Sequence, residues 1–278
     1  MSLVAMAAAK AAPGVTTSAV ALAGVWPADH GRQVLLAECD PGGGDLAARF
    51  GLAAEPGLVS LAAAARRELG AAMVAEHAQT LPGGLRVLLG PAGAEQAVAA
   101  LSMLASGAVA TLDRLDEIDV VADLGRLDPG SPALPLARAA SLLLLVVRPR
   151  LAELQHLAHL VAWLRQQCRA LGLVLVGSGP YPADEIAGAL GAEVVGALPA
   201  DRRAAALLAS RTAGVAALRR TSLVRGARSL AEAVVPRLAA WSPAPPSGVE
   251  PSQVAPAVLH GGLSPVLPSS GTAPEAGA

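Results

Sequence analysis

The residues best suited to binding a charged group stand in one short loop near the start of the sequence. Residues 10–17 read K-A-A-P-G-V-T-T and lie between an apolar run at 2–9 and an apolar segment at 16–23. The first run is typical of a buried strand, and the second is typical of a helix with Thr16 or Thr17 in its first turn. In a strand, loop and helix of this kind, backbone N–H groups and the helix dipole stabilise an anion. The loop therefore predicts a phosphate-binding site.

Acidic side chains stand where two further apolar segments end. Glu38 lies near the end of the segment 33–39, and Asp40 directly follows that segment in a glycine-rich turn. Asp123 is the last residue of the segment 118–123. The carboxyl ends of parallel strands meet at one edge of a sheet, where open α/β sheets bind ligands. Alternatively, the two aspartates only cap the turns that follow them, as is common in turns. We expect these carboxylates to converge with the phosphate-binding loop.

Segments that suit buried strands alternate with helical segments along the chain, which predicts an α/β fold with a mostly parallel central sheet and helices on both faces. The expected strands are residues 2–9, 33–39, 85–89, 118–123, 141–147, 172–176 and 193–198. The expected helices are residues 16–23, 58–69, 71–81, 94–115, 151–171 and 221–238. We expect a single domain at 1–240. Pro, Ser, Gly and Ala dominate 241–278, which predicts a disordered tail.

The composition narrows the class of protein. The chain has 278 residues, is 53% hydrophobic and carries a net charge of -1, which suits a large core and argues against a strongly basic nucleic-acid binder. Cys39 and Cys168 have the spacing of neither a zinc site nor a disulfide framework. No basic stretch precedes the first apolar run, and the apolar stretch 139–147 is far shorter than the roughly 20 residues of a spanning helix. We expect a cytoplasmic protein without a membrane span.

The loop resembles the deviant phosphate-binding loop of the MinD/ParA family, whose pattern is K-G-G-x-G-K-[TS]-[TS]. Lys10, which is the only lysine of the chain, and Gly14 match this pattern, as do both threonines. Ala11 and Ala12 replace glycines, and Val15 replaces the second lysine, which in the family contacts the β- and γ-phosphates. Because valine offers neither a charge nor a donor, the resemblance implies slow or absent ATP hydrolysis.

Three more segments are similar to motifs of the same family, and they occur in the family's order. Glu38 and Asp40, followed by a proline, resemble its second acidic motif. Asp123 resembles the aspartate of its Walker B strand, and Pro199 and Asp201 resemble its G-x-[IL]-P-x-D segment, which lies against the base. Asp201 would alternatively serve as a helix N-cap.

The resemblance covers roughly residues 1–240 and implies a P-loop NTPase-like fold that binds ATP and Mg²⁺ and forms a homodimer. It implies that Asp40 positions the attacking water and that Lys10 acts on the phosphates, so both are candidate catalytic residues. It places Thr16, Glu38 and Asp123 around the metal. The nucleotide-binding residues that it implies are Lys10, Ala11, Ala12, Pro13, Gly14, Val15, Thr16, Thr17, Pro199 and Asp201.

Three functions remain open. The first is a MinD/ParA-like dimerising switch, with weak or impaired ATP hydrolysis, that positions chromosomes, septum sites or secretion and pilus machinery through an unknown protein cargo. The second is a non-catalytic pseudo-ATPase scaffold similar to the TadZ/CpaE group of pilus and secretion systems. The third is a DNA-binding partition factor, which depends on the arginine-rich segment 202–228, with Arg202, Arg203, Arg211, Arg219, Arg220, Arg225 and Arg228.

Overall fold

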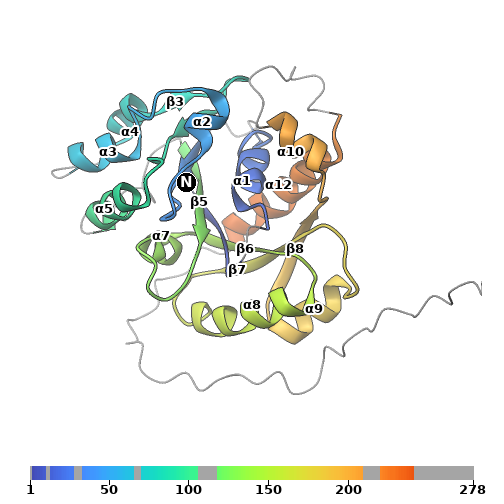
Figure 1. Ribbon diagram of the computed structural model, residues 1–278. Coiled ribbons are helices and arrows are strands. Elements are labelled where there is room, and N and C mark those ends of the chain that lie inside the picture. Colours follow the sequence, from blue (N-terminus) through green and yellow to red (C-terminus); the bar gives the residue numbers. More distant parts are fainter. Residues whose placement is uncertain are drawn as a thin grey trace, which may run out of the picture.

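The computed structural model describes residues 2–10, 13–27, 33–65, 70–105, 118–208 and 220–240, which form one α/β unit (Figure 1). Its strands are β1 (Leu3–Ala8), β2 (Gln33–Glu38), β3 (Gln79–Thr80), β4 (Arg86–Leu88), β5 (Ile118–Arg126), β6 (Leu142–Val147), β7 (Leu171–Val176) and β8 (Glu193–Leu198). Its helices are α1 (Val15–Ala23), α2 (Leu46–Phe50), α3 (Leu58–Ala64), α4 (Ala71–His77), α5 (Ala94–Ala105), α7 (Leu134–Ala139), α8 (Leu151–Leu164), α9 (Ala183–Leu190), α10 (Arg202–Leu208) and α12 (Ser222–Ala240).

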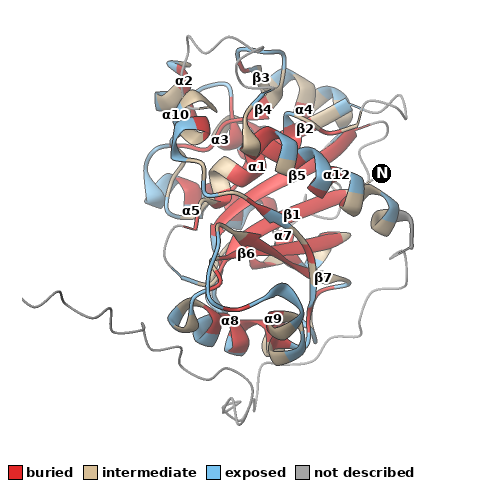
Figure 2. Ribbon diagram, turned by 90° about the vertical axis from the view of Figure 1, so that its right-hand side faces the viewer, coloured by how far each residue is buried: buried red, intermediate tan, exposed pale blue. Residues whose placement is uncertain are grey.

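The strands form one sheet in the order β3-β4-β2-β5-β1-β6-β7-β8. Every pair is parallel except β3 with β4. β1 therefore lies in the interior of the sheet, between β5 and β6, and is buried along its whole length (Figure 2). A strand that is covered on both faces reads as a continuous apolar run, which is why residues 2–9 predicted it.

Helices cover both faces of the sheet, and each face has its own core. Successive side chains of a strand point to opposite faces, and in β1 alternate residues join different clusters. Leu3 and its alternates pack in the cluster that includes residues of α3, α5, α8 and α9. Val4 and its alternates pack with α1, α2 and α12 on the other face (Figure 1). The predicted α/β fold with a mostly parallel sheet is confirmed.

Some predicted boundaries are wrong. The helix expected at 71–81 ends at His77, and the chain then adds the edge strand β3, which pairs antiparallel with β4. The helix expected at 151–171 ends at Leu164, before β7 begins. The sequence also gave no expectation of the short helices α2, α7 and α9. Parts of the helices expected at 58–69 and 94–115, and all of the tail at 241–278, lie outside the described residues.

The parallel register brings the chemically interesting residues to one edge. Glu38 pairs with Asp123 across β2 and β5, and the N–H of Cys39 donates to the carbonyl of Asp123 over 2.7 Å. Lys10 follows β1, which is the other neighbour of β5. Lys10, Asp40 and Asp123 thus lie at the same edge of the sheet, as the sequence predicts. Within the described part of the chain, no helix combines the length and apolar character needed to cross a membrane.

Candidate functional site

The N-terminus of α1 is open toward the phosphate-binding loop. Gly14 precedes the helix with φ 97°, a left-handed conformation that glycine adopts without strain. Its carbonyl accepts hydrogen bonds from the N–H of Ser18 over 2.9 Å and from the hydroxyl of Ser18 over 2.8 Å. The first turn contains no acidic residue and its start has no side-chain cap, so the helix end suits an anion. Ala11 and Ala12 lie outside the described residues.

Val15 occupies the position of the motif's second lysine, and its side chain lies in the core. It is the first residue of α1, is only 6% exposed and packs in the core on the α1 face of the sheet. The next two residues belong to different parts of the site. Thr16 contacts the Asp123 carboxylate, and Thr17 lines the cavity described below.

Asp123 is the most unusual carboxylate of the site. It is 1% exposed, and its Oδ1 accepts the N–H of Gly125 over 3.0 Å, whereas Oδ2 has no hydrogen-bond partner within the described residues. Burial raises the pKa of Asp123 to about 6, although hydrogen bonds from the Thr16 side chain and the Gly125 N–H oppose that shift. A buried oxygen without a partner is costly in the free protein. It is therefore a candidate metal ligand.

Glu38 holds three parts of the backbone together. Its Oε1 accepts the N–H groups of Asp45 over 2.8 Å and Leu46 over 3.0 Å at the start of α2, and its Oε2 accepts the N–H of Gly90 over 2.9 Å. Burial raises the pKa of Glu38 to about 7, against the lowering effect of these three hydrogen bonds. Because both oxygens are engaged, Glu38 orders the loops beside the site. Its place near the metal's water shell stays a prediction.

Asp40 lies against the C-terminal end of β5. Its Oδ1 accepts the N–H of Gly42 over 2.7 Å, and burial raises its pKa. Gly125, with φ 57°, lies so near that a Cβ at this position would collide with the Asp40 carboxylate. The close approach explains the glycine and places Asp40 beside the end of β5 that carries Asp123. The structure thus brings Thr16, Asp40 and Asp123 together.

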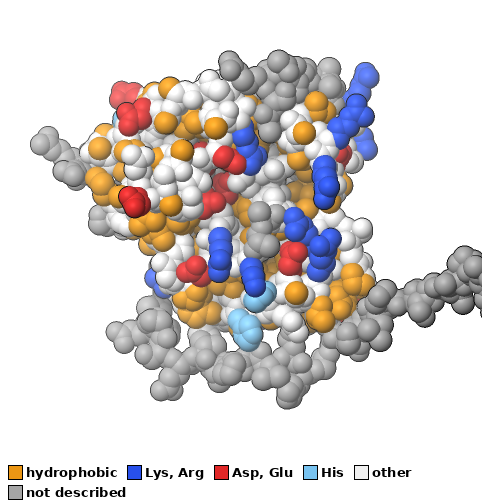
Figure 3. Space-filling model, in the orientation of Figure 1, with side chains coloured by type: hydrophobic (Ala, Val, Ile, Leu, Met, Phe, Trp, Pro, Cys, Tyr) orange, Lys and Arg blue, Asp and Glu red, His pale blue; other side chains and the backbone are white. Residues whose placement is uncertain are grey.

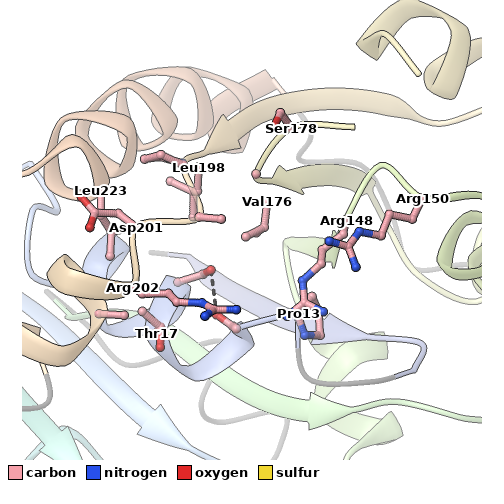
Figure 4. Close-up of a pocket in the computed structure, with 16 residues that line it drawn as sticks. Pro13, Thr17, Arg148, Arg150, Val176, Ser178, Leu198, Asp201, Arg202 and Leu223 are labelled. Carbon is pink, nitrogen blue, oxygen red and sulfur yellow. Dashed lines mark hydrogen bonds between the residues drawn. The ribbon is translucent and has the colours of Figure 1, made fainter. Parts of the chain in front are cut away.

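A cavity of about 450 Å³ opens at the N-terminus of α1 (Figure 4). Its wall contains five of the residues that the resemblance implies bind nucleotide, namely Pro13, Gly14, Thr17, Pro199 and Asp201. The Asp201 carboxylate accepts the N–H of Ala204 over 2.8 Å and the hydroxyl of Ser222 over 2.7 Å, so it caps α10 and joins that helix to α12. Lys10 and Val15 do not line this cavity.

Three arginines of the cavity wall were not predicted as site residues. Arg148 and Arg150 follow β6, and Arg202 begins α10. The sequence did contain a signal for the first two, because they directly follow an apolar strand at the ligand-binding edge of a parallel sheet. Gly125 was also missed as a site residue, since only the fold shows how near it lies to Asp40.

Lys10 points toward α8 and away from the cavity. Its Nζ lies 3.0 Å from Nε2 of His156, in a hollow of about 310 Å³ that Asp128, His159 and Trp163 also line. Among the residues that the structure describes, no group of three or more His, Cys, Asp or Glu side chains is arranged to hold a metal ion. Because Lys10 contacts His156 in this structure, its role at the phosphates stays a prediction.

The fold, rather than the sequence, relates the chain to known proteins. The sequence matches no protein-family model and no curated protein. The structure is similar to that of the cell division ATPase MinD of Pyrococcus furiosus, with 20% identity, a TM-score of 0.66, and coverage of 84% of this chain and 98% of that one. It is similar to the septum site-determining protein MinD of Pyrococcus horikoshii with Mg-ADP, at 17% identity, a TM-score of 0.68, and coverage of 87% and 98%.

A ParA family ATPase of Chlorobium tepidum is similar as well, with 17% identity, a TM-score of 0.66, and coverage of 83% of this chain and 97% of that one. The open helix end, the buried carboxylates and the mostly parallel sheet are those of an α/β protein with a P-loop NTPase-like fold. More narrowly, the fold is that of MinD and the ParA family ATPases.

Proposed function

We propose that this chain is a MinD/ParA-like nucleotide-dependent switch that binds ATP and Mg²⁺, hydrolyses ATP slowly, forms a homodimer and positions a protein cargo. The arrangement around the α1 N-terminus carries the proposal. An open helix end with Thr17 faces a cavity, and Thr16 faces a buried carboxylate, one oxygen of which has no partner in the described part of the chain. The similarity of the fold to that of MinD from Pyrococcus horikoshii, which was solved with Mg-ADP, supports the same assignment.

The residues present fit a magnesium ion. Asp123 offers an oxygen that has no partner among the described residues, Thr16 offers a hydroxyl beside it, and the Asp40 carboxylate lies next to the same end of β5. Hard oxygen ligands of this kind suit Mg²⁺. When bound, the ion would neutralise negative charge on the phosphates. Asp40 would orient a water, and the N-terminus of α1 would hold the phosphates through backbone N–H groups.

Isothermal titration of the full chain with ATP and with ADP tests this proposal. We expect weak binding that strengthens when Mg²⁺ is added, and we expect Asp123→Asn to remove the magnesium-dependent part. Asp184→Asn on α9 changes an exposed carboxylate away from the site and is the matched control. Absence of binding to a folded protein at millimolar nucleotide would contradict the proposal.

The buried Val15 favours a second candidate, a non-catalytic scaffold of a pilus or secretion system. Hydrolysis requires charge stabilisation on the transferred phosphoryl group, and valine provides none. A phosphate-release assay separates the candidates. Nucleotide binding without turnover, in a protein that still dimerises, supports the scaffold. Slow but saturable turnover supports the switch.

Exposed arginines favour a third candidate, non-specific DNA binding. Five of the seven arginines of the segment 202–228 are described, and all five are exposed: Arg202, Arg203, Arg220, Arg225 and Arg228. Arg211 and Arg219 lie outside the described residues. Figure 3 shows basic side chains in the region of α10 and α12. DNA affinity that falls steeply with salt would support this function, and no shift of duplex DNA at low salt would exclude it.

A further inference from the structure

The 450 Å³ cavity is strongly basic, and its basic groups are arginines. Its charged lining residues within the described part of the chain are Arg148, Arg150, Arg202 and Asp201. The two oxygens of Asp201 accept hydrogen bonds from α10 and from Ser222 of α12. Since this carboxylate is engaged in capping, the arginines determine the charge that the cavity presents to a ligand.

The cations that the sequence motif would supply are not in this cavity. Val15 occupies the position of the loop lysine and is buried in the core. Lys10 lies with His156 in the hollow beside α8. A phosphate chain at the N-terminus of α1 would therefore contact neither Lys10 nor the loop lysine of the motif, which Val15 replaces. Its negative charge needs another partner.

The sheet register places Arg148 at the level of the phosphate-binding loop. β6 runs parallel to β1, with Ala7 opposite Leu145, so the two strands end near each other, and Arg148 directly follows the last residue of β6. Arg148 contacts Glu153 of α8 in two ways. Its backbone N–H donates to the Glu153 carboxylate over 3.2 Å, and its Nη1 lies 3.6 Å from the same carboxylate.

Arg202 approaches from the opposite wall. It begins α10, which packs against α1, and its side chain extends toward Thr17 (Figure 4). In the same view Arg148 and Arg150 extend from the β6 side toward Pro13. Guanidinium groups thus flank the open end of α1 on two sides. Their planar donors match phosphate oxygens in pairs, which a single ammonium does not.

We propose that Arg148 and Arg202 hold the phosphate chain of a nucleoside polyphosphate from opposite walls of the cavity, in place of the missing loop lysine. Arg150 adds positive charge at the same wall as Arg148. Glu153 is a positioning residue that competes with the ligand for Arg148. The inference rests on the proposed nucleotide binding and adds the residues that give the site its preference for a polyphosphate.

Titration calorimetry of the full chain with AMP, ADP and ATP in Mg²⁺ tests the pair. For Arg148→Gln and for Arg202→Gln, we expect ATP affinity to fall by about tenfold or more, as for loss of a hydrogen bond to a charged group. The loss should grow in the order AMP, ADP, ATP, because a longer phosphate chain meets more of both guanidinium groups. Arg148→Lys and Arg202→Lys should lose less, since the charge remains.

Two further variants separate this role from a merely structural one. Glu153→Gln should tighten ATP binding a few-fold, because it removes the carboxylate that competes for Arg148. Arg225→Gln removes an exposed arginine that does not line the cavity, and it should leave affinity unchanged. Thermal unfolding of each variant reports whether it is folded, and the exposed Arg202 carries the test if an Arg148 variant is not.

The outcomes are distinguishable. If the native chain binds ATP and both Gln variants bind it equally well, the arginine inference is overturned and the proposed function stands. An equal loss for AMP and ATP would likewise overturn it, because the arginines would then not act on the phosphate chain. If the native chain binds no nucleotide at all, the proposed function fails and this inference fails with it.

Discussion

At the scale of single residues, the site lacks the positive charge of the loop lysine and contains a buried carboxylate that is incompletely hydrogen-bonded within the described residues. Val15 places an apolar side chain in the core where the family motif has a lysine. Asp123 places a carboxylate in the interior and leaves one oxygen without a partner among the described residues. The first feature lowers the expected catalytic power. The second costs stability in the free protein and is typical of functional sites.

The Asp123→Asn substitution should stabilise the protein in the absence of magnesium and nucleotide. Burial raises the pKa of Asp123 from 3.8 to about 6, so the native state binds a proton that the unfolded state has already released. The stability contributed by Asp123 is fully present below pH 3.8 and is lost as pH rises through about 6. Asparagine does not titrate. Its advantage over aspartate should therefore grow through that window to about 1–3 kcal/mol above it.

Thermal unfolding of both proteins in a chelator, measured from about pH 4 to pH 8, checks this difference. Asp184→Asn is again the control, because that carboxylate is exposed. A variant that is less stable than the native chain at neutral pH would show that the Asp123 charge has a stabilising partner.

The Val15→Lys substitution should tighten ATP binding and raise turnover, while lowering the thermal stability of the free protein. The valine is 6% exposed, and loss of its packing should cost about 1–2 kcal/mol. The new ammonium would add charge where the phosphates are held. Val15→Met is the control, because it has a similar length and no charge. Calorimetry and phosphate release measure the gain. If both lysine and methionine leave them at background, the loop does not bind phosphate.

At the scale of elements, the sequence predicted what a strong apolar pattern determines. Strands such as β1 and β6 are buried on both faces, so their residues form continuous apolar runs. The two-residue β3 has no such pattern. It forms because it pairs with β4, and the helical propensity of residues 71–81 concealed it.

The same distinction holds for the site. The loop and the strand-end carboxylates carry sequence motifs, so they were predicted as candidates. The cavity wall formed by Arg148 and Arg202 comes from elements that are adjacent only in the folded sheet. The contacts of Lys10 with α8 likewise depend on tertiary packing, which no local pattern reports.

The C-terminal end of β5 offers a test at this scale, through Gly125→Ala. Gly125 has φ 57°, and a Cβ there would collide with the Asp40 carboxylate. We expect the variant to displace Asp40, to abolish ATP turnover and to lower stability by about 1–3 kcal/mol. Gly188→Ala is the control. Gly188 lies within α9, where a Cβ meets nothing within 4 Å, so alanine should stabilise the helix by about 0.5–1 kcal/mol.

Thermal unfolding and phosphate release check both glycine variants. Turnover that survives Gly125→Ala at the native rate would mean that the position of Asp40 beside Gly125 does not matter for hydrolysis.

At the scale of the whole molecule, the eight-stranded sheet with a core on each face already forms a complete α/β unit within the described residues. The segment 241–278 lies outside those residues, and its composition predicts that folding does not require it. A chain truncated after Ala240 should unfold at the same temperature as the full chain, within about 1 °C. Calorimetric scanning of both chains measures this, and a loss of several degrees would assign the segment a structural role.

Dimerisation is the last property that belongs to the molecule as a whole. Lys10 lies 3.0 Å from His156 in the single chain, and a switch would need it to leave this contact and reach the phosphates of a partner. We expect ATP and Mg²⁺ to double the molar mass of an Asp40→Ala variant, in which turnover is blocked, as measured by light scattering during size exclusion. Lys10→Ala should prevent the doubling. His156→Ala should favour it at lower ATP, because it removes the contact that holds Lys10 beside α8. A protein that binds ATP and stays monomeric would contradict the switch. A dimer that forms equally well without nucleotide, and with Lys10→Ala, would instead support the scaffold, since its assembly would not depend on the phosphates.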